Sequence, residues 1–522
     1  MEKRINEAVM INKKIYIYIN NLPYRITGVE ISALQRAHIL SQYEGYDVYI
    51  LIRSFNKNLL KIIDNFRSRF DLGNKVFFIN LYADFLGFFC VDSLNLKDDV
   101  LENKKYDVVK LSETHERLYA KDKKLNKYVV YFDKENAENF KPIDYINYFF
   151  NGEKIKKEHF LLNGKIVFVQ EFDQFGKCYR AYYYDYLGVV RIVIDYQSGN
   201  IKLIYLNDER GNLFEIFKTE DDLFVWWLEK FYLGENSIVL IDGGPHHIQS
   251  FRGLKSKLAI VSILHSNHIQ VGQNILTGNF YSSERKRLLE TPDSVDACII
   301  LTEEQKNDID SRLPQHCPLF TIEHSCFNLV KFVDFEFRDL DRMVIISRLE
   351  KEKNIFDAID IVKMVVDELP NKKLYIYGAG SQEKELHKYI HENELSEYIF
   401  LMGYATDISK ELNRASLFLM TSLYESFGLS ILESLSHGVP VLSYDFRYGP
   451  RTLIQNKKNG FIVENKNKEK AAQTIIEYFK NINKMEVMMD NAYKSTQAFH
   501  PKKIAEKWSV LFNTLLENKF LK

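Results

Sequence analysis

One stretch decides the fold: Ser422-Leu-Tyr-Glu-Ser-Phe-Gly-Leu-Ser-Ile-Leu-Glu-Ser-Leu-Ser-His-Gly-Val-Pro-Val441. It follows an apolar run, turns through Glu425–Gly428 and continues with helical spacing until Gly438-Val-Pro440. This order predicts a strand, a turn and a helix whose first N–H groups can face a phosphate. Glu425 and Glu433 would lie about 12 Å apart at ~1.5 Å per residue. Alone, such a pair is typical of a solvated helix face; the whole string is far more specific.

Two regions of the chain alternate short apolar runs with helix-length amphipathic segments, which is the pattern of parallel sheets covered by helices. The runs of the first region are Ile15–Asn20, Val48–Ile52, Ser237–Asp242, Leu258–His265, Ala297–Thr302 and Leu319–His324. The runs of the second region are Met343–Arg348, Lys373–Gly378, Ile399–Gly403, Leu417–Ser422 and Val439–Asp445. Because open α/β sheets bind ligands at the carboxyl ends of their strands, we expect the site there.

The stretch between residues 76 and 218 has another pattern. Tyr-, Val- and Ile-rich runs such as Tyr179–Tyr186 and Val189–Tyr196 are separated by turn residues, including Asn163-Gly164 and Gly176. Hairpin turns and β-propensity together predict an antiparallel meander. Its many tyrosines fit a half-buried sheet surface better than a carbohydrate-binding face, although both interpretations stay open.

These patterns predict an α/β protein of several domains. Residues 1–75 and 219–335 are expected to form the first α/β domain, interrupted by an antiparallel β-sheet at 76–218. Residues 336–498 are expected to form the second α/β domain, and 499–522 a C-terminal helix that returns to the first. The charged segment Asp334–Arg342 is the candidate joint.

Composition excludes several classes of protein. Of 522 residues, 46% are hydrophobic and 27% charged, which excludes an intrinsically disordered chain. The 70 Lys and Arg against 71 Asp and Glu leave no basic excess, so no nucleic-acid partner is expected. No apolar stretch reaches the ~18 residues of a membrane span, so membrane contact would be peripheral at most. Five scattered cysteines argue against a disulfide scaffold or zinc cluster and for a reducing, cytoplasmic location: Cys90, Cys178, Cys298, Cys317 and Cys326.

The stretch 422–441 resembles the E-x7-E signature of retaining glycosyltransferases of family four. Ile346-Ser-Arg348-Leu-Glu-Lys-Glu-Lys353 is similar to the segment whose Arg and Lys hold the donor pyrophosphate. Tyr377-Gly-Ala-Gly380 and Leu401-Met-Gly-Tyr404 resemble the strand ends around the nucleobase. The resemblance implies the GT-B fold, in which two Rossmann-like domains face each other, here with a β-rich insertion in the first.

The resemblance also implies roles for individual residues. Breaking a sugar–phosphate bond places negative charge on the leaving diphosphate, and catalysis needs fixed positive groups there. Arg348 would supply a forked donor set and Lys353 a mobile point charge. Glu425 would meet the reacting face of the donor sugar, and Glu433 the ribose hydroxyls. The expected donor-binding residues are Gly28, Gly378, Met402, Tyr404, Ser426, Phe427, Gly428, Leu429 and Glu433.

The first region carries weaker signals. Thr27-Gly28-Val-Glu30 is similar to the family's glycine-bearing loop beneath the diphosphate. His265 ends a predicted strand, where the family often places a histidine that touches the donor sugar; a structural role is the alternative. His268 has metal-ligand spacing from His265, but no third ligand is apparent. The fold class generally works without metal, so we expect neither a metal nor a cofactor beyond the UDP-sugar. Three further features carry no expected metal or donor role: the turn histidines His246-His247 and the pairs Asp308/Asp310 and Asp339/Asp341.

Family members with an inserted β-sheet include the poly(glycerol-phosphate) and poly(ribitol-phosphate) α-glycosyltransferases of Gram-positive bacteria and the transferases of Ser-rich adhesins. Gly28-Val-Glu30, Leu264–His268, Ile300–Gln305 and Tyr444–Pro450 resemble this subgroup, whereas Arg451 departs from the small polar residue expected there. The resemblance implies transfer of glucose or N-acetylglucosamine from a UDP-sugar to a wall teichoic-acid-type polyol-phosphate. Two alternatives stay open: transfer to Ser/Thr of an adhesin, and a non-catalytic acceptor-binding partner. We expect the insertion to engage the acceptor, a second copy or a partner glycosyltransferase.

Overall fold

The computed structural model describes residues 14–24, 26–87, 106–110, 116–120, 126–131, 143–161, 165–234, 237–242, 244–254, 258–326, 332–405 and 407–520. Side chains are described within these ranges except at 106–144 and 520. Cys90 and the predicted turn at Asn163-Gly164 lie outside the described residues.

The first domain is built on a seven-stranded parallel sheet with the order β3-β2-β1-β14-β15-β16-β17. Its strands are β1 (Lys14–Ile19), β2 (Asp47–Ile52), β3 (Val76–Asn80), β14 (Ser237–Ile241), β15 (Leu258–Ile263), β16 (Ala297–Ile300) and β17 (Leu319–Thr321). Its helices are α2 (Gly28–Tyr43), α3 (Leu59–Arg69), α4 (Leu81–Leu86), α5 (Glu220–Phe231), α6 (Ile248–Phe251), α7 (Ser283–Glu290) and α8 (Glu303–Arg312). The order of this sheet extends that of doubly wound dinucleotide-binding domains.

The predicted boundary at residue 75 is wrong. Strand β3 pairs in parallel with β2, from Val48 opposite Val76 to Ile52 opposite Asn80, and so completes the edge of the first sheet. The segment is a short apolar run like the other parallel strands, and Asn80 then caps α4 by accepting a hydrogen bond from the backbone of Ala83. The chain therefore leaves the parallel sheet only after α4.

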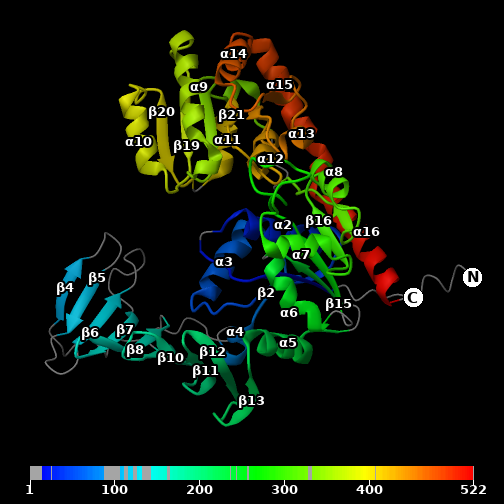
Figure 1. The fold of residues 1–522 in the computed structure, drawn as a ribbon. Coiled ribbons are helices and arrows are strands. Elements are labelled where there is room, and N and C mark those ends of the chain that lie inside the picture. Colours follow the sequence, from blue (N-terminus) through cyan, green and yellow to red (C-terminus); the bar gives the residue numbers. More distant parts are fainter. Residues whose placement is uncertain are drawn as a thin grey trace, which may run out of the picture.

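The insertion is a ten-stranded antiparallel meander with the order β13-β12-β11-β10-β9-β8-β7-β6-β5-β4, as its pattern predicts. Its strands are β4 (Tyr106–Lys110), β5 (Glu116–Ala120), β6 (Asn126–Tyr131), β7 (Ile143–Phe150), β8 (Glu153–Phe160), β9 (Ile166–Phe172), β10 (Cys178–Tyr184), β11 (Val190–Gln197), β12 (Asn200–Asn207) and β13 (Leu213–Phe217). In Figure 1 it extends away from the two α/β domains.

The side chains of β1 point alternately into two hydrophobic cores, and the insertion contributes to one of these cores. Ile15 and Ile17 point into one hydrophobic core, and Tyr16 and Tyr18 into another. The second core also contains inward residues of the meander, among them Val167, Ala181, Ile192, Ile194, Ile204 and Leu206. One part of the meander thus covers a face of the first domain.

The second domain contains a six-stranded parallel sheet with the order β20-β19-β18-β21-β22-β23. Its strands are β18 (Arg342–Ile346), β19 (Lys373–Tyr377), β20 (Ile399–Gly403), β21 (Leu417–Met420), β22 (Val441–Tyr444) and β23 (Gly460–Val463). Its helices are α9 (Ile355–Glu368), α10 (Glu383–Glu392), α11 (Ile408–Arg414), α12 (Leu429–Ser436), α13 (Pro450–Leu453), α14 (Lys468–Phe479) and α15 (Ile482–Ser495). The prediction of two doubly wound domains with a β-rich insertion is confirmed.

The last helix, α16 (Pro501–Phe520), runs from the second domain down along the first (Figure 1). It packs against α2 and β15. The Arg36 guanidinium lies 4.9 Å from the ring centroid of Trp508, and Lys519 forms an ion pair with Asp296 at 2.7 Å. The C-terminal helix is therefore built into the first domain. Within the described ranges, no helix is long and apolar enough to cross a membrane.

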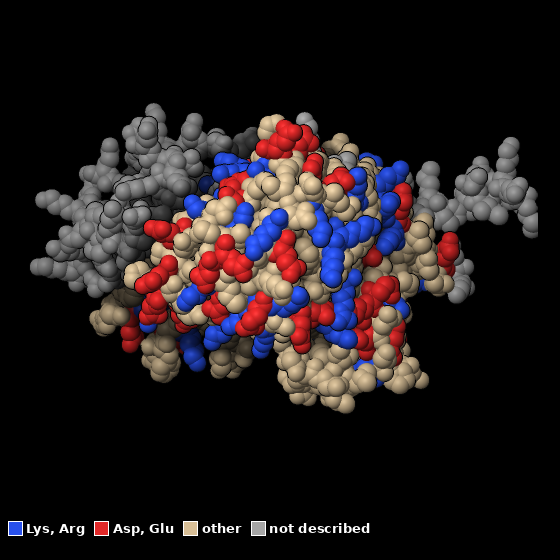
Figure 2. Space-filling model, turned by 90° about the horizontal axis from the view of Figure 1, so that it is seen from above, with Lys and Arg blue, Asp and Glu red and all other residues tan. Residues whose placement is uncertain are grey.

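Basic and acidic side chains intermingle on the face that Figure 2 shows from above. This agrees with a formal net charge of -1.

Candidate active site

Each doubly wound sheet has a switch point, where chain order reverses between two neighbouring strands and a crevice opens at their carboxyl ends. In the second sheet the reversal lies between β18 and β21, and in the first between β1 and β14. Lys353 follows β18, and Glu425 follows β21. The residues predicted from the sequence therefore lie beside the crevice where such folds bind nucleotides.

Lys353 and Glu425 meet in the second domain. The Lys353 ammonium donates to the Glu425 carboxylate, which also accepts from the Ser422 hydroxyl at 3.1 Å. Their side chains are only 13% and 18% exposed. Backbone contacts hold the two loops together, since the Leu423 N–H donates to the Glu352 carbonyl at 2.8 Å. A cation and an anion are thus placed side by side in a largely desolvated position.

Arg348 lies on the same loop but in a different environment. Its side chain is 63% exposed and forms an ion pair at 2.7 Å with Glu352, four residues along the chain. An exposed guanidinium on a long side chain can reorient at little cost toward a bound diphosphate. Its predicted role in holding the donor diphosphate stays a prediction.

The E-x7-E stretch has the local structure that its sequence predicts. Gly428 has φ 88°, a left-handed conformation that favours glycine, and α12 begins at the next residue, Leu429. Ser426 is half-buried and Phe427 is buried in the turn before it. Glu425 lies in this turn and not on the helix, whereas Glu433 lies in the last turns of α12.

Glu433 has an unusual titration. Burial raises the pKa of its carboxyl to about 7, and Arg69 of α3 opposes this weakly from the first domain. The charged form of a poorly hydrated carboxyl is costly, so this group gains when hydrogen-bond donors reach it. Ribose hydroxyls, the predicted partners, are such donors.

The neighbouring strand ends differ in exposure. A Cβ added to Gly378 would lie 1.8 Å from the Ser347 carbonyl oxygen, so glycine is required for the close approach of these loops. Met402 and Tyr404, at the end of β20, are 47% and 52% exposed. Large exposed side chains at a strand end are available to contact a flat base.

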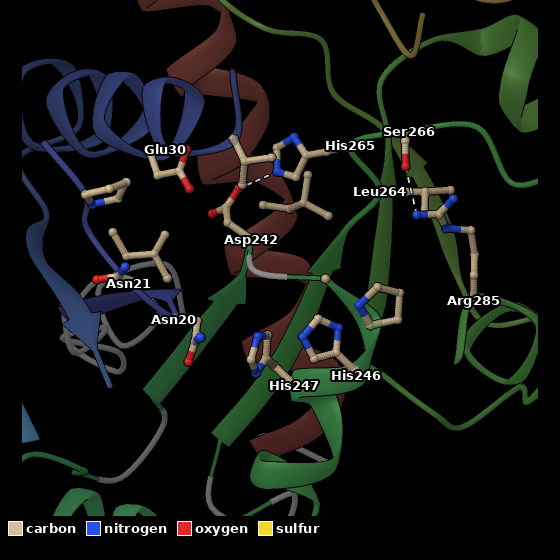
Figure 3. A pocket seen from close by; sticks show the side chains of 16 residues that line it. Asn20, Asn21, Glu30, Asp242, His246, His247, Leu264, His265, Ser266 and Arg285 are labelled. Atoms are coloured by element: carbon tan, nitrogen blue, oxygen red, sulfur yellow. Dashed lines mark hydrogen bonds and ion pairs between the residues drawn. The ribbon is translucent and has the colours of Figure 1, made fainter. Parts of the chain in front are cut away.

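The first domain has a cavity of about 440 Å³ at the carboxyl ends of β1, β14 and β15 (Figure 3). His265 lines it and contacts the Asp242 carboxylate through Nε2 at 2.6 Å. Asp242 also pairs with Arg36 at 2.6 Å, and both side chains are almost fully buried. Burial alone would raise the pKa of Asp242, but Arg36 and His265 outweigh it and lower that pKa. His265 is therefore oriented by a buried charged pair.

The glycine-bearing loop, Thr27–Glu30, faces the second domain. Glu30 accepts hydrogen bonds from the Thr27 N–H at 2.8 Å and hydroxyl at 2.6 Å, which caps α2, and it also lines the cavity. A Cβ added to Gly28 would lie 3.6 Å from Cδ1 of Leu429. The start of α2 therefore faces the start of α12 across the domain interface.

Other contacts also cross the interface. The ring of the buried His324 is parallel to that of His265, with centroids 6.0 Å apart, and lies edge-on to the Phe427 ring, with centroids 5.2 Å apart. The His324 segment thus reaches the domain interface. Arg447 forms ion pairs with Asp308 and with Glu304, the latter at 3.6 Å.

The contacts of Arg451 account for an arginine at a position where a small polar residue is expected. It pairs with Asp445 at 2.7 Å and reaches Glu304 of the first domain at 3.7 Å. Asp308 accepts from the Tyr448 hydroxyl at 2.7 Å, and Asp341 pairs with Lys372. The two Asp-x-Asp motifs therefore contribute to an interface and to a partly buried ion pair.

No group of three or more His, Cys, Asp or Glu side chains that could hold a metal lies within the described residues. His268 is buried, burial lowers its pKa to about 4, and its ring stacks on Tyr448 at 6.3 Å. His268 therefore packs at the interface with the second domain.

Sequence reasoning missed two parts of the site. Asp242 ends its strand just as His265 ends the next, and that shared position was the available signal. His246 and His247 form the predicted turn, as the short 3₁₀ helix η3 (Pro245–His247), but they also wall the cavity (Figure 3).

Comparisons with known proteins find similarity to glycosyltransferases. Residues 331–495 match the family model described as Glycosyl transferases group 1. The chain is 27% identical to the poly(glycerol-phosphate) α-glucosyltransferase of Bacillus subtilis (strain 168), over 96% of this chain and 75% of that protein. It is 29% identical to a poly(ribitol-phosphate) α-N-acetylglucosaminyltransferase of Staphylococcus aureus (strain COL), over 74% and 76% of the two chains. A peptide N-acetylglucosaminyltransferase GtfA subunit of Streptococcus agalactiae is 24% identical, over 73% and 76%.

A solved structure shows the same fold. A mutant of S. aureus TarM in complex with Fondaparinux, α-GlcNAc-glycerol and UDP has a TM-score of 0.79 at 24% identity, covering 96% of this chain and 99% of that one. The second domain of this protein therefore belongs to the group 1 glycosyl transferases, and the whole chain is a glycosyltransferase homologue with the GT-B fold.

Proposed function

We propose that this protein is a retaining α-glycosyltransferase that moves glucose or N-acetylglucosamine from a UDP-sugar to a wall teichoic-acid-type polyol-phosphate. The observation that carries the proposal is the Lys353–Glu425 pair at the switch point of the group 1 domain. The similarity to polyol-phosphate transferases, which extends over most of the chain, supports the acceptor.

In the proposed reaction, residues of both domains contact the donor. The sugar–phosphate bond breaks with negative charge growing on the diphosphate, which Lys353 and Arg348 neutralise together with the backbone N–H groups at the start of α12. Glu425 meets the positive character at the anomeric carbon. His265, oriented by Asp242, contacts the donor sugar from the first domain, and the acceptor hydroxyl approaches through the cavity beside it.

Contacts to the nucleotide complete the proposal. Glu433 binds the ribose hydroxyls, and Met402 and Tyr404 flank the base. We expect no metal, because the cations of the chain itself meet the diphosphate. A cytoplasmic location is part of the proposal and fits the reducing compartment that the scattered cysteines predict.

Two alternatives differ in the acceptor or in catalysis. Transfer to Ser or Thr of an adhesin is supported by the similarity to the GtfA subunit. A non-catalytic acceptor-binding partner would not need the donor residues, yet Arg348, Lys353, Glu425 and Glu433 are all present. A panel of UDP-sugars and acceptors, with products identified by mass spectrometry and anomeric configuration by NMR, tests all three. Glycosylated peptide without glycosylated polyol-phosphate would refute the proposed acceptor, and no product from any pair would refute catalysis.

A further inference from the structure

A second cavity, of about 240 Å³, adjoins the first along its wall. Pro245 and His246 line both cavities. Figure 3 shows His246 among the side chains that line the first cavity, which also include Arg285 of α7. The second cavity therefore lies next to the cavity that His265 lines.

Two arginines line the second cavity from different elements. Arg252 begins the 3₁₀ turn η4 (Arg252–Leu254), and Arg287 lies on α7. Both arginines are exposed, and neither guanidinium has a hydrogen bond or ion pair within the described part of the chain. Ten N–H donors, five on each arginine, are thus available to a ligand.

Glu284 is the acidic residue of this cavity, and its charge is already engaged. Hydrogen bonds at the N-terminus of α7, from its own backbone and from Ser282 and Ser283, lower the pKa of Glu284, with a smaller contribution from Arg287. Two cations therefore share the cavity with one carboxylate that the end of its own helix stabilises. The cavity favours an anion.

An acceptor chain supplies such an anion only if it is a polyol-phosphate, which carries one phosphodiester in every repeat. We propose that Arg252 and Arg287 bind a phosphodiester of the acceptor outside the polyol unit that receives the sugar. Arginine forks match the oxygens of a phosphate, and an unmodified serine-rich peptide offers no such group. This inference rests on the proposed function and adds a polymer subsite to it.

The test is a double variant, Arg252→Gln/Arg287→Gln, compared with Lys286→Gln. Lys286 is an exposed cation on the same helix that lines neither cavity and lies 3.9 Å from Glu290. The acceptors are oligo(glycerol phosphate) of several repeats and free glycerol, which has no phosphate. UDP affinity and thermal unfolding are measured for each variant, so that a misfolded protein is recognised.

We expect the double variant to raise the KM for oligo(glycerol phosphate) on the order of tenfold or more, because charge-assisted hydrogen bonds are lost. Transfer to glycerol and UDP affinity should stay unchanged, and Lys286→Gln should behave like the wild type. Added salt should weaken oligomer binding by the wild type more than by the double variant.

The outcomes separate this inference from the proposed function. An unchanged KM in a double variant, when the wild type glycosylates the oligomer, overturns the subsite and leaves the function. Arginine-dependent binding of the oligomer without transfer supports the subsite and refutes the function. A wild type that neither binds nor glycosylates the oligomer overturns both.

Discussion

The Lys353 ammonium forms an ion pair with the Glu425 carboxylate, although 72 residues separate them in the sequence. The loops after β18 and β21 bring them together at the switch point of the second sheet. In the proposed reaction, Lys353 faces the leaving diphosphate and Glu425 faces the anomeric carbon of the donor sugar.

Glu425→Gln and Lys353→Ala should lower turnover much more than donor affinity. Their charges oppose charges that grow only as the bond breaks, so their interactions are stronger in the transition state. Removing one such partner typically costs on the order of 10²–10³ in kcat. Steady-state kinetics with a UDP-sugar, and calorimetry with UDP, measure the two quantities. A Lys353→Ala enzyme changed only in KM would contradict this placement.

Glu433→Ala should mainly weaken nucleotide binding, because ribose does not change during the reaction. UDP binding near pH 6.5 should also release protons, since ribose hydroxyls that donate to the carboxylate lower its pKa from about 7. Calorimetry in buffers of different ionisation enthalpy measures this release, and Glu433→Gln should abolish it. Equal release by Glu433→Gln would assign the proton to another group.

The same pKa predicts a dependence of stability on pH. The folded carboxyl, with a pKa of about 7, binds protons more tightly than an unfolded one near 4.5. Its contribution to the free energy of unfolding is therefore fully present below pH 4.5 and declines as pH rises through 7. Thermal unfolding of the wild type relative to Glu433→Gln should show this decline. A difference that does not vary with pH would show that burial does not perturb this carboxyl.

Asp242→Asn should destabilise the protein by about 3 kcal/mol, because it leaves Arg36 buried without its carboxylate. Turnover should also fall, since His265 loses its orienting partner. Arg36→Met combined with Asp242→Asn should be more stable than Asp242→Asn alone, because no unpaired charge remains. Denaturant unfolding measures these two variants and Arg36→Met alone. Strictly additive losses would mean that the two side chains are not coupled.

Transfer should persist without divalent metal, because Lys353 and Arg348 are expected to neutralise the diphosphate. Single-turnover transfer in the presence of a chelator tests this expectation. Loss of transfer that Mn²⁺ or Mg²⁺ restores would falsify it.

Phe214→Glu should spare UDP affinity and impair polymer transfer or self-association. Phe214 is 51% exposed on β13, an edge strand of the meander beside the exposed Leu213 and Ile216. Apolar edge strands are natural pairing surfaces. Val487→Glu, on the similarly exposed α15 of the second domain, is the matched control. A folded Phe214→Glu protein with weakened UDP binding would count against this role.

Local sequence determined the elements that hold the site. The apolar runs before Arg348, His265 and Ser422 became parallel strands, because periodicity and β-propensity act over neighbouring residues. The turn before Gly428 and the helix that ends at Ser436, shortly before Gly438, likewise follow from local backbone preferences. These signals, with the family resemblance, were enough for the fold and placed the residues expected to bind the donor at the ends of the strands.

Only the tertiary structure decided which of these residues meet. The pairing of Lys353 with Glu425, the support of His265 by Asp242 and Arg36, and the cavity that joins His246 to Arg252 and Arg287 all depend on strand order and helix packing. The same holds for β3, which reads as part of the inserted stretch until it pairs with β2. Such contacts join residues far apart in the chain, and burial and charge pairing between them leave no local pattern in the sequence.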